Sequence, residues 1–493
     1  MQESSEGKKT NAAEVREDIE GFKRAVERVA SAFRKIPSSE TVRLISHLDA
    51  DGISAVALMA KALNRQNMMY SMSILPQLKA EDVKLLANEN HKYYVFTDLG
   101  SSQLSSMLSY LKGKVIFVLD HHQPEDVDNE KLFENNIYHV NPHLFSIDGS
   151  TKISGAGVTF YFVRALNTKN EDLAHIAIIG TIGDVQEPMG SKLNQEIVDI
   201  AKKHNKIEVI KGLRIFGAQT KPLHRALVQS TDFYIPGVTG SESGAIQFLK
   251  QLEIEPKENG KWRRIIDLKD EELKRLVEGI IMMRFGEENP EDILGNIYLL
   301  NDEEEGSTLK DAKEFATVLN ACGRLGRASL GVGACLGDKR LKVMAVEALN
   351  DYRKELVSAL KWFEKNRNSE KVVEEPGFLI INAGEEVLST IIGTVASIIS
   401  RSSAIPKNTF IVSMARMMDG HTKISIRYSG NRSSHSNGIN LKEILQRVIV
   451  KFDGEAGGHV NAAGAYIKTE QEQAFIDHIK SVLRRVSVEE RIT

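Results

Sequence analysis

Three short apolar segments near the start of the chain each end in acidic residues or histidines, and a fourth apolar segment also ends in an aspartate. The residues at these four ends are His47, Asp49, Asp51, Asp98, Asp120, His121, His122 and Asp184. The carboxyl ends of parallel strands meet at one edge of a sheet, where ligands bind. A helix cap would explain one aspartate, but it leaves the others without a role. We therefore expect these side chains to form one shared site.

The side chains of this site predict a metal centre. Carboxylate oxygens combined with imidazole nitrogens suit Mn²⁺ or Mg²⁺, and Zn²⁺ less well. The carboxylates are numerous enough for some of them to bridge two ions. We expect two divalent cations, with Mn²⁺ as the first choice and Mg²⁺ as the alternative.

The segments that must position these residues alternate between strand-like and helix-like patterns. Residues 42–63 read as a strand, an acidic turn and a helix that begins near Gly52. Repeated over residues 40–205, this alternation predicts an α/β domain with a doubly wound, mostly parallel sheet. Residues 1–39 read as a polar tail, disordered over residues 1–12, and a helix with an apolar stripe. That helix either packs on the α/β domain, which the stripe favours, or binds a partner.

The remainder of the chain divides into two further regions. Residues 206–374 predict a mostly helical insertion and connector, and residues 375–493 predict a smaller α+β domain. In the last region, residues 423–429 alternate so that Ser425 and Arg427 share one face of a strand. Residues 454–464 are rich in glycine, which lets the backbone approach an anion.

The motifs resemble those of a known superfamily. HLDADG, FTDLG, LDHH and GTIGD occur in the order of the motifs of the DHH phosphoesterase superfamily, and GEAGGHVNAAGA resembles the glycine-rich histidine motif of its DHH-associated domain. Within the superfamily the chain is most similar to archaeal RecJ-like exonucleases, which include the GINS-associated nuclease. The family usually has three glycines before the histidine, and Ala456 replaces the first of them.

The resemblance implies roles for the residues of the predicted metal site. The metal ligands would be Asp49, Asp51, Asp98, His121 and Asp184. Asp98 would bridge the ions, His122 would lie near the scissile phosphate, and Asp120 would orient a histidine. Bacterial RecJ usually has aspartate where this chain has His47, which would be either a ligand or a support for one.

The resemblance and local patterns also suggest substrate contacts. These residues are Arg427, His459, Gly457, Gly458, Asn320, Arg324 and Ser154. Ser154 precedes a glycine-containing helix start that either binds a phosphate or is simply capped. The segment around Asn320 and Arg324 either contacts the phosphodiester or packs helices through its glycines. Trp262, between basic residues, either stacks on a nucleotide or begins a solvated helix.

The composition narrows the class of partner and compartment. The chain has 64 Lys and Arg against 67 Asp and Glu, so nucleic acid would have to bind a local basic patch. Cys322 and Cys335 do not indicate a disulfide framework. The sequence shows no signal peptide and no apolar run long enough to cross a membrane. We expect a cytoplasmic protein with no membrane partner.

Taken with the resemblance, the motifs favour a metal-dependent exonuclease that hydrolyses single-stranded DNA or RNA in DNA replication or repair. One alternative with the same chemistry is a nanoRNase or a cyclic-dinucleotide phosphodiesterase. Another is a replisome scaffold that binds GINS, although a silent scaffold has no reason to keep so many clustered carboxylates. An active nuclease could also bind GINS.

Overall fold

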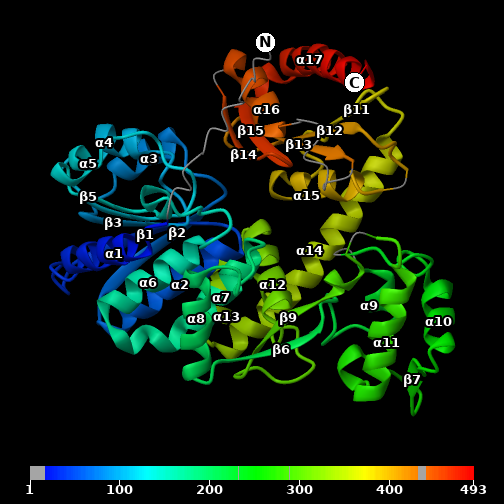
Figure 1. The fold of residues 1–493 in the computed structure, drawn as a ribbon. Coiled ribbons are helices and arrows are strands. Elements are labelled where there is room, and N and C mark those ends of the chain that lie inside the picture. The colour runs from blue at the N-terminus through cyan, green and yellow to red at the C-terminus, as the bar shows by residue number, and fades with distance from the viewer. Residues whose placement is uncertain are drawn as a thin grey trace, which may run out of the picture. The chain divides into compact units, whose positions relative to one another are not determined.

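A computed structural model of the chain describes residues 17–230, 233–287, 289–402, 404–430, 440–452 and 454–492. The predicted disorder of residues 1–12 lies outside the described residues. The chain divides into two compact units, Met1–Leu349 and Asn350–Thr493, which Figure 1 shows in blue to yellow-green and in yellow to red. This division falls inside the long helix α14 (Lys339–Asn366), whereas the change in sequence texture suggested a boundary after residue 374.

Unit 1 is built on a five-stranded sheet whose strands are all parallel. The strands are β1 (Thr41–His47), β2 (Met69–Leu75), β3 (Tyr93–Thr97), β4 (Val115–Leu119) and β5 (Ile137–Val140). They lie in the order β2-β1-β3-β4-β5, so the direction of winding reverses between β1 and β3. The predicted doubly wound parallel sheet is confirmed, and its reversal point is where such sheets bind ligands.

Helices cover both faces of this sheet (Figure 1). One face carries α1 (Ile19–Phe33), α2 (Ala50–Arg65) and α6 (Gly155–Leu166), and the other carries α3 (Ala80–Ala87) and α4 (Leu104–Tyr110). The ring of Phe33 lies 5.0 Å from that of Phe117 in β4 and 5.5 Å from that of Phe162 in α6. The apolar stripe of α1 therefore packs on the α/β domain, as predicted.

The remaining elements of unit 1 are α5 (Asn129–Glu134), which shares the core of α3 and α4, and the helices and strands that follow α6 in the chain (Figure 1). The latter include α7 (Ala174–Gly183), α8 (Lys192–Lys203), α9 (Leu223–Val228), α10 (Glu242–Gln251), α11 (Asp270–Met283), α12 (Ala312–Arg324) and α13 (Ala328–Cys335), with β6 (Ile207–Leu213), β7 (Lys257–Glu258), β8 (Lys261–Trp262) and β9 (Leu294–Leu300). Helices α12 and α13 pack on α2, and α12 also packs on α7.

The middle region is mostly helical, as predicted, but β6 and β9 form an antiparallel pair that the sequence did not indicate. Within β6 only the two end residues, Ile207 and Leu213, are buried. The strand therefore lacks the regular alternation of buried and exposed residues that marks a strand in a sequence. Between β6 and β9 the chain forms its own core, which includes Leu227, Phe248 and Leu276.

The segment around Trp262 is a short hairpin rather than a helix start. Strands β7 and β8 pair across Asn259-Gly260, where Gly260 has φ +76°. The ring of Trp262 lies 4.1 Å from that of His224, and Lys257 Nζ lies 4.3 Å from its centre. Both following arginines pair with acids of this region, Arg263 with Glu272 and Arg264 with Asp267. The aromatic and basic groups of this segment are therefore engaged within the fold.

Unit 2 is an α+β domain around a six-stranded mixed sheet, as predicted. In their order across the sheet, the strands are β10 (Val372–Glu375), β11 (Phe378–Asn382), β12 (Thr409–Arg416), β13 (His421–Ser429), β15 (Ala462–Lys468) and β14 (Glu455–His459). Helix α15 (Ser389–Ile399) packs on β12 and β13. Helices α16 (Leu441–Ile449) and α17 (Glu472–Ile492) contribute to the core on the opposite face, with Phe410, Ile426 and Phe475. A turn that contains Asp419-Gly420 joins β12 to β13, and Gly420 has φ +81°.

Within the described ranges, none of the helices combines the length and apolar character that a membrane-spanning segment needs. Cys322 and Cys335 are buried free thiols.

Candidate metal centre

The turn after β1 places His47 and Asp49 at the edge of the sheet. Asp49 caps α2, because its carboxylate accepts a hydrogen bond from the Gly52 N–H at 3.0 Å. The Nδ1 atom of His47 lies 2.9 Å from Asp49 Oδ2. Burial alone would lower the pKa of His47, but the charge of Asp49 and its contact raise it well above its usual value. Asp49 therefore serves both the helix and the site.

Asn320 supports this turn from α12. Its side-chain oxygen accepts a hydrogen bond from the Ala50 N–H at 3.0 Å, at the start of α2. A Cβ on Gly323 would lie 1.6 Å from the Leu48 carbonyl oxygen, so this glycine permits the close approach of α12. The structure thus favours a packing role for this segment. A substrate contact by Arg324, the last residue of α12, stays a prediction.

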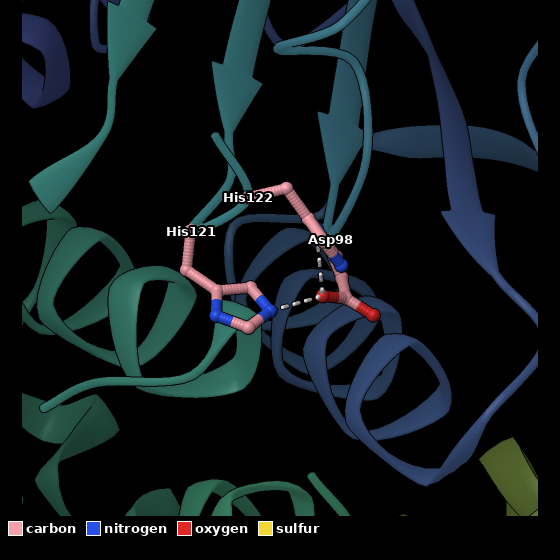
Figure 2. A group of neighbouring side chains, drawn as sticks. All are labelled: Asp98, His121 and His122. Carbon is pink, nitrogen blue, oxygen red and sulfur yellow. Dashed lines mark ion pairs between the residues drawn. The ribbon is translucent and has the colours of Figure 1, made fainter. Parts of the chain in front are cut away.

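Asp98 faces both His121 and His122 (Figure 2). It follows β3 with φ +58°, a left-handed conformation in which a non-glycine residue is uncommon. Its Oδ1 lies 3.2 Å from His121 Nε2, and its Oδ2 lies 3.5 Å from His47 Nδ1. The side chain is only 1% exposed, yet neither oxygen makes a hydrogen bond within the described residues. Two buried acceptors without donors carry a large desolvation cost, which a cation would offset.

Asp120 orients His122. Its Oδ1 accepts hydrogen bonds from His122 Nδ1 at 2.8 Å and from the His121 N–H at 2.8 Å, and its Oδ2 accepts one from the Ser101 N–H at 2.9 Å. Burial would raise the pKa of Asp120, but His122 and these hydrogen bonds hold it far below its usual value. The contact with Asp120 fixes the ring of His122 through Nδ1. Because the side chain of His122 is 47% exposed, the other ring nitrogen remains available.

Asp51 occupies the amino end of α6. Its two oxygens accept hydrogen bonds from the Gly155 N–H at 2.6 Å and the Ala156 N–H at 3.0 Å. Ser154 is fully buried and caps its own helix by accepting from the Gly157 N–H at 3.2 Å. The structure thus shows the capping alternative for Ser154, and the donors of this helix end serve Asp51 and the cap. A substrate contact by Ser154 stays a prediction.

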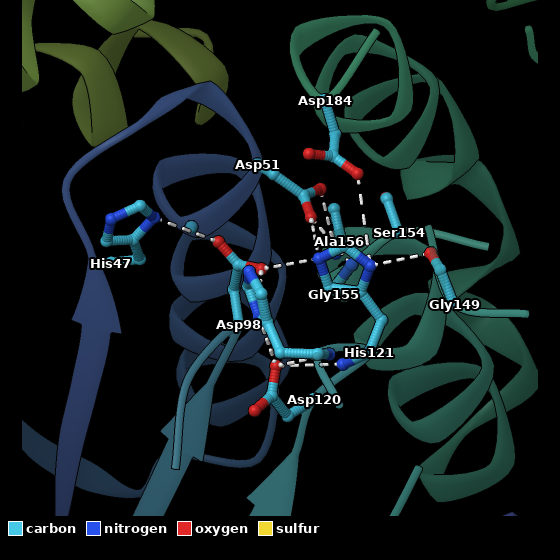
Figure 3. A network of polar contacts seen from close by, with 12 residues as sticks. His47, Asp51, Asp98, Asp120, His121, Gly149, Ser154, Gly155, Ala156 and Asp184 are labelled. Carbon is cyan, nitrogen blue, oxygen red and sulfur yellow. Dashed lines mark hydrogen bonds and ion pairs between the residues drawn. The ribbon is translucent and has the colours of Figure 1, made fainter. Parts of the chain in front are cut away.

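His121 is held by a carbonyl group that the sequence did not reveal. Its Nδ1 lies 2.8 Å from the Gly149 oxygen, and since a carbonyl can only accept, Nδ1 carries the proton. Its Nε2 then faces Asp98 and, at 3.7 Å, Asp51 Oδ2 (Figure 3). The same Gly149 oxygen accepts from Gln186, which also donates to Asp184 at 2.8 Å. No local pattern marks Gly149 or Gln186, because their roles depend on tertiary contacts.

The charges of the cluster require compensation. Burial, followed by the charge of Asp98, raises the pKa of Asp51 well above its usual value. Burial and the charges of Asp98 and Asp49 raise the pKa of Asp184 to about 6. Such carboxylates repel one another unless protons or cations lie between them.

Three sets of side chains could each hold a metal ion. They are Asp98-His121-His122, His47-Asp49-Asp98 and Asp51-His121-Asp184. Asp98 and His121 each belong to two sets, so ligands could be shared. Hard oxygen donors and imidazoles fit Mn²⁺ or Mg²⁺. The residues present therefore fit divalent cations.

The substrate contacts predicted in unit 2 lie on β13 and β14, two strands of the same sheet that are separated by β15. Arg427 in β13 donates hydrogen bonds to Ser397 Oγ at 2.8 Å and to the Ala463 carbonyl of β15 at 3.3 Å. Gly457 and Gly458 are exposed in β14, at the edge of the sheet. Gly458 has φ +126°, and a Cβ there would lie 2.5 Å from the Ala462 oxygen. His459 ends β14, and its side chain lies outside what the structure describes.

The sheet edge and its carboxylate–histidine cluster define an α/β protein with a candidate site for divalent cations. Comparison with known families gives three matches: residues 41–181 match the DHH family, N-terminal domain, residues 215–295 the DHH-CID domain, and residues 377–485 the DHHA1 domain. These three domains place the chain in the DHH superfamily, and its fold is RecJ-like.

Relatives and solved structures agree with this assignment. The uncharacterized protein MJ0831 of Methanocaldococcus jannaschii is 29% identical over 446 residues, covering 90% of this chain and 93% of the relative. RecJ of Thermus thermophilus in complex with Mn²⁺ matches with a TM-score of 0.55 and 18% identity, covering 94% of this chain. The match spans only 55% of that RecJ, about half its length. CDC45 of Entamoeba histolytica matches with a TM-score of 0.61 and 11% identity, covering 94% of this chain and 99% of CDC45. These structural similarities show the fold.

Proposed function

We propose that this protein is a metal-dependent phosphodiesterase that acts as an exonuclease on single-stranded DNA or RNA, in DNA replication or repair. The observation that carries the proposal is Asp98, a buried carboxylate without hydrogen bonds in the described part of the chain, which lies between two histidines and belongs to two of the three candidate metal sets. Superfamily membership and the manganese complex of Thermus RecJ support it.

Two divalent cations, Mn²⁺ or alternatively Mg²⁺, would be held by two of these sets. His47, Asp49 and Asp98 would hold one, and Asp51, His121 and Asp184 would hold the other. The resemblance to the superfamily implies that Asp98 would also contribute to the second ion. When bound, the cations would supply the positive charge that polarises a phosphodiester and activates water.

The protein's own groups would position the substrate. Burial alone would lower the pKa of His122, but Asp120, which accepts from Nδ1, raises it, so the ring protonated on both nitrogens can donate a hydrogen bond from Nε2 to a phosphate oxygen. Gly149 keeps the proton of His121 on Nδ1, so that its Nε2 lone pair is available as a ligand. In unit 2, Arg427, Gly457, Gly458 and His459 would bind the nucleotide through charge and backbone N–H groups.

A digestion assay tests this proposal. The full chain is incubated with end-labelled single strands of DNA and RNA, with Mn²⁺ or Mg²⁺ and with EDTA. We expect stepwise shortening that requires a divalent cation and stalls at a hairpin stem. Short oligonucleotides or cyclic dinucleotides cleaved in preference to long strands would favour the alternative phosphodiesterases. Hydrolysis in excess EDTA would contradict the metal mechanism.

A second role in a replication complex is favoured by a separate observation. The middle region matches the DHH-CID domain, and the whole chain resembles CDC45 in fold. We propose GINS as a partner that the enzyme binds while remaining a nuclease. Calorimetry of purified GINS with the wild type and with Asp98→Asn tests this, because binding should survive the loss of hydrolysis. Absence of binding by the active wild type would remove the scaffold role and leave the nuclease.

A further inference from the structure

The turn after α7 contains a strained residue. Val185 has φ +60°, and the other non-glycine residues with positive φ in the described ranges are Asn, Asp, Ser or Glu. A β-branched residue rarely adopts this conformation, because its side chain crowds the backbone. Val185 is 93% exposed, so packing of its own side chain cannot compensate. The residues on either side must hold the turn.

The two residues that follow Val185 are held by contacts with distant parts of unit 1. Gln186 is buried, and its amide N–H groups donate to the Gly149 oxygen at 2.9 Å and to Asp184 Oδ2 at 2.8 Å. Glu187 accepts hydrogen bonds from the Tyr298 hydroxyl and, at 3.1 Å, from Asn296 Nδ2, both in β9. The strained turn is therefore anchored at the metal cluster on one side and at β9 on the other.

The side chain of Gln186 contacts two groups of the metal cluster, the carboxylate of Asp184 and the carbonyl that holds His121. It donates directly to Asp184, a candidate ligand, and it shares the Gly149 carbonyl with Nδ1 of His121, another candidate ligand. Figure 3 shows Gly149, His121 and Asp184 on one side of the cluster. A shift of the Gln186 amide would thus move both side chains of the set that includes Asp51.

The oxygen atom of the Gln186 amide does not stabilise the fold. The Oε1 atom of Gln186 is buried and has no hydrogen-bond partner within the described residues. A buried acceptor without a donor destabilises the folded state, and an apolar side chain of similar size avoids that cost. We therefore attribute the presence of glutamine at position 186 to its two N–H donors and not to a gain in stability.

We propose that Gln186 is a positioning residue: with the strained turn at Val185, it sets Asp184 and His121 in the arrangement that binds the second cation. This inference rests on the proposed metal-dependent function. It adds a residue that determines metal affinity without being a ligand, and it links the metal centre through Glu187 to β9, a strand of the middle region.

The test compares Gln186→Leu and Gln186→Glu with the wild type in the full chain. Leu removes the donors and the orphaned oxygen, whereas Glu keeps the shape but places an acceptor against two other acceptors. Mn²⁺ binding is measured by calorimetry, and the unfolding midpoint is measured in urea without metal. Gln195→Leu, the same change at an exposed position of α8, is the control.

We expect Gln186→Leu to weaken binding of one Mn²⁺ by about 10- to 100-fold, as for other residues that support metal ligands. Its metal-free midpoint should equal or exceed that of the wild type, and kcat should fall while KM for the strand stays unchanged. Gln186→Glu should weaken Mn²⁺ binding further, and Gln195→Leu should leave it unchanged. Unchanged Mn²⁺ affinity in both Gln186 variants would overturn the inference.

A lower midpoint of Gln186→Leu without metal would also overturn it, since the residue would then be structural. The Mn²⁺ titration separates this inference from the proposed function. If the wild type binds Mn²⁺ but shortens no strand, the exonuclease proposal fails while the role of Gln186 is still decided by the titration.

Discussion

The acidic edge of the sheet in unit 1 and the glycine-rich edge strand in unit 2 are both candidate binding regions, yet they are built in opposite ways. In unit 1 the reactive groups are side chains, and Asp51, Asp98 and His121 are buried. In unit 2, β14 offers exposed backbone at Gly457 and Gly458. A site for small cations needs fixed, desolvated ligands, whereas a site for a polymer needs an open surface.

The acidic edge and β14 also differ in what their backbone groups contact. At the acidic edge, Asp51 is fixed by two N–H groups of α6 and His121 by one carbonyl oxygen. In β14, a Cβ added to Gly457 would meet no atom within 4 Å. Substitutions in unit 1 should therefore act on metal binding and chemistry, and those in unit 2 on the affinity for the strand.

The largest effect is expected from Asp98→Asn. The amide removes the charge shared by two metal sets, so hydrolysis should fall by more than about a hundredfold, the upper end for residues that only support ligands. The metal-free protein should be as stable as the wild type or more so, because repulsion among the carboxylates decreases. Strand digestion and urea unfolding without metal measure the two effects. Activity within about tenfold of the wild type would contradict the assignment of Asp98.

The next effect compares one glycine from each region. A Cβ at Gly155 would lie 2.5 Å from Asp98 Oδ1, so Gly155→Ala should displace Asp98 and weaken Mn²⁺ binding by about 10- to 100-fold. Gly457→Ala should leave Mn²⁺ binding and stability unchanged, because its Cβ meets open space, but it should weaken binding of a single strand. Calorimetry with Mn²⁺ and fluorescence anisotropy with a labelled strand separate the two. If both variants lose only strand affinity, the division of roles is wrong.

The sequence predicted the acidic edge well because parallel strands bring their carboxyl ends together wherever they occur. The apolar runs before Asp49, Asp98 and Asp120 are the strands β1, β3 and β4. Their order in the sheet, with β1 between β2 and β3, is a tertiary property that the runs alone do not contain.

The sequence failed where a role depends on contacts between distant segments. Ser154 and its glycines look like a phosphate site, but only the structure shows that Asp51 takes the N–H groups of Gly155 and Ala156. Gln186 lies two residues after a predicted ligand, yet its function depends on the carbonyl of Gly149, 37 residues earlier. The exposed, non-alternating β6 likewise finds its partner β9 far along the chain.

Two buried glutamates should respond to pH in opposite directions. Burial raises the pKa of Glu314 in unit 1 to about 7, and within the described ranges its carboxyl accepts hydrogen bonds from two neutral groups, Thr220 and the Gln219 N–H. Burial would also raise the pKa of Glu472 in unit 2, but Arg416, at 2.9 and 3.0 Å, and Thr422 lower it. In the folded protein the carboxyl of Glu314 therefore favours its protonated form, and the carboxyl of Glu472 favours its ionised form.

The direction in which pH changes the stability depends on whether the folded or the unfolded chain binds the proton more tightly. Folded Glu314 binds its proton more tightly than the unfolded chain does, so its stabilisation is present below its ordinary pKa and is lost as the pH rises through about 7. Glu314→Gln should raise the stability of unit 1 at about pH 8 by roughly 2 to 3 kcal/mol and change little at about pH 4, since one pKa unit is worth about 1.4 kcal/mol. Glu472→Gln should instead destabilise unit 2 at about pH 8, with a smaller penalty in acid, where the carboxylate of the wild type begins to protonate.

The two tryptophans report on the units separately. Trp262 lies in unit 1 and Trp362 in unit 2, and the chain has only these two. Urea unfolding of Trp362→Phe therefore follows unit 1 through Trp262, and unfolding of Trp262→Phe follows unit 2. Equal pH dependence of Glu314→Gln and its parent would show that Glu314 is ionised in the fold.

The smallest effect is expected from Arg427→Ala in unit 2. Losing one charged hydrogen bond to a phosphate should raise KM for the strand by about tenfold, with kcat and Mn²⁺ affinity unchanged. The slope of log affinity against log salt should become shallower by somewhat under one unit, because one fewer counterion is released. Arg427→Lys keeps the charge and should restore the slope but only part of the affinity, since an ammonium cannot bind a phosphate bidentately. Lys407→Ala, at an exposed position of the same unit, is the matched control and should change neither quantity. If Arg427→Ala lowered kcat with KM and the salt slope unchanged, Arg427 would act in the chemical step and the two regions would not divide binding from catalysis.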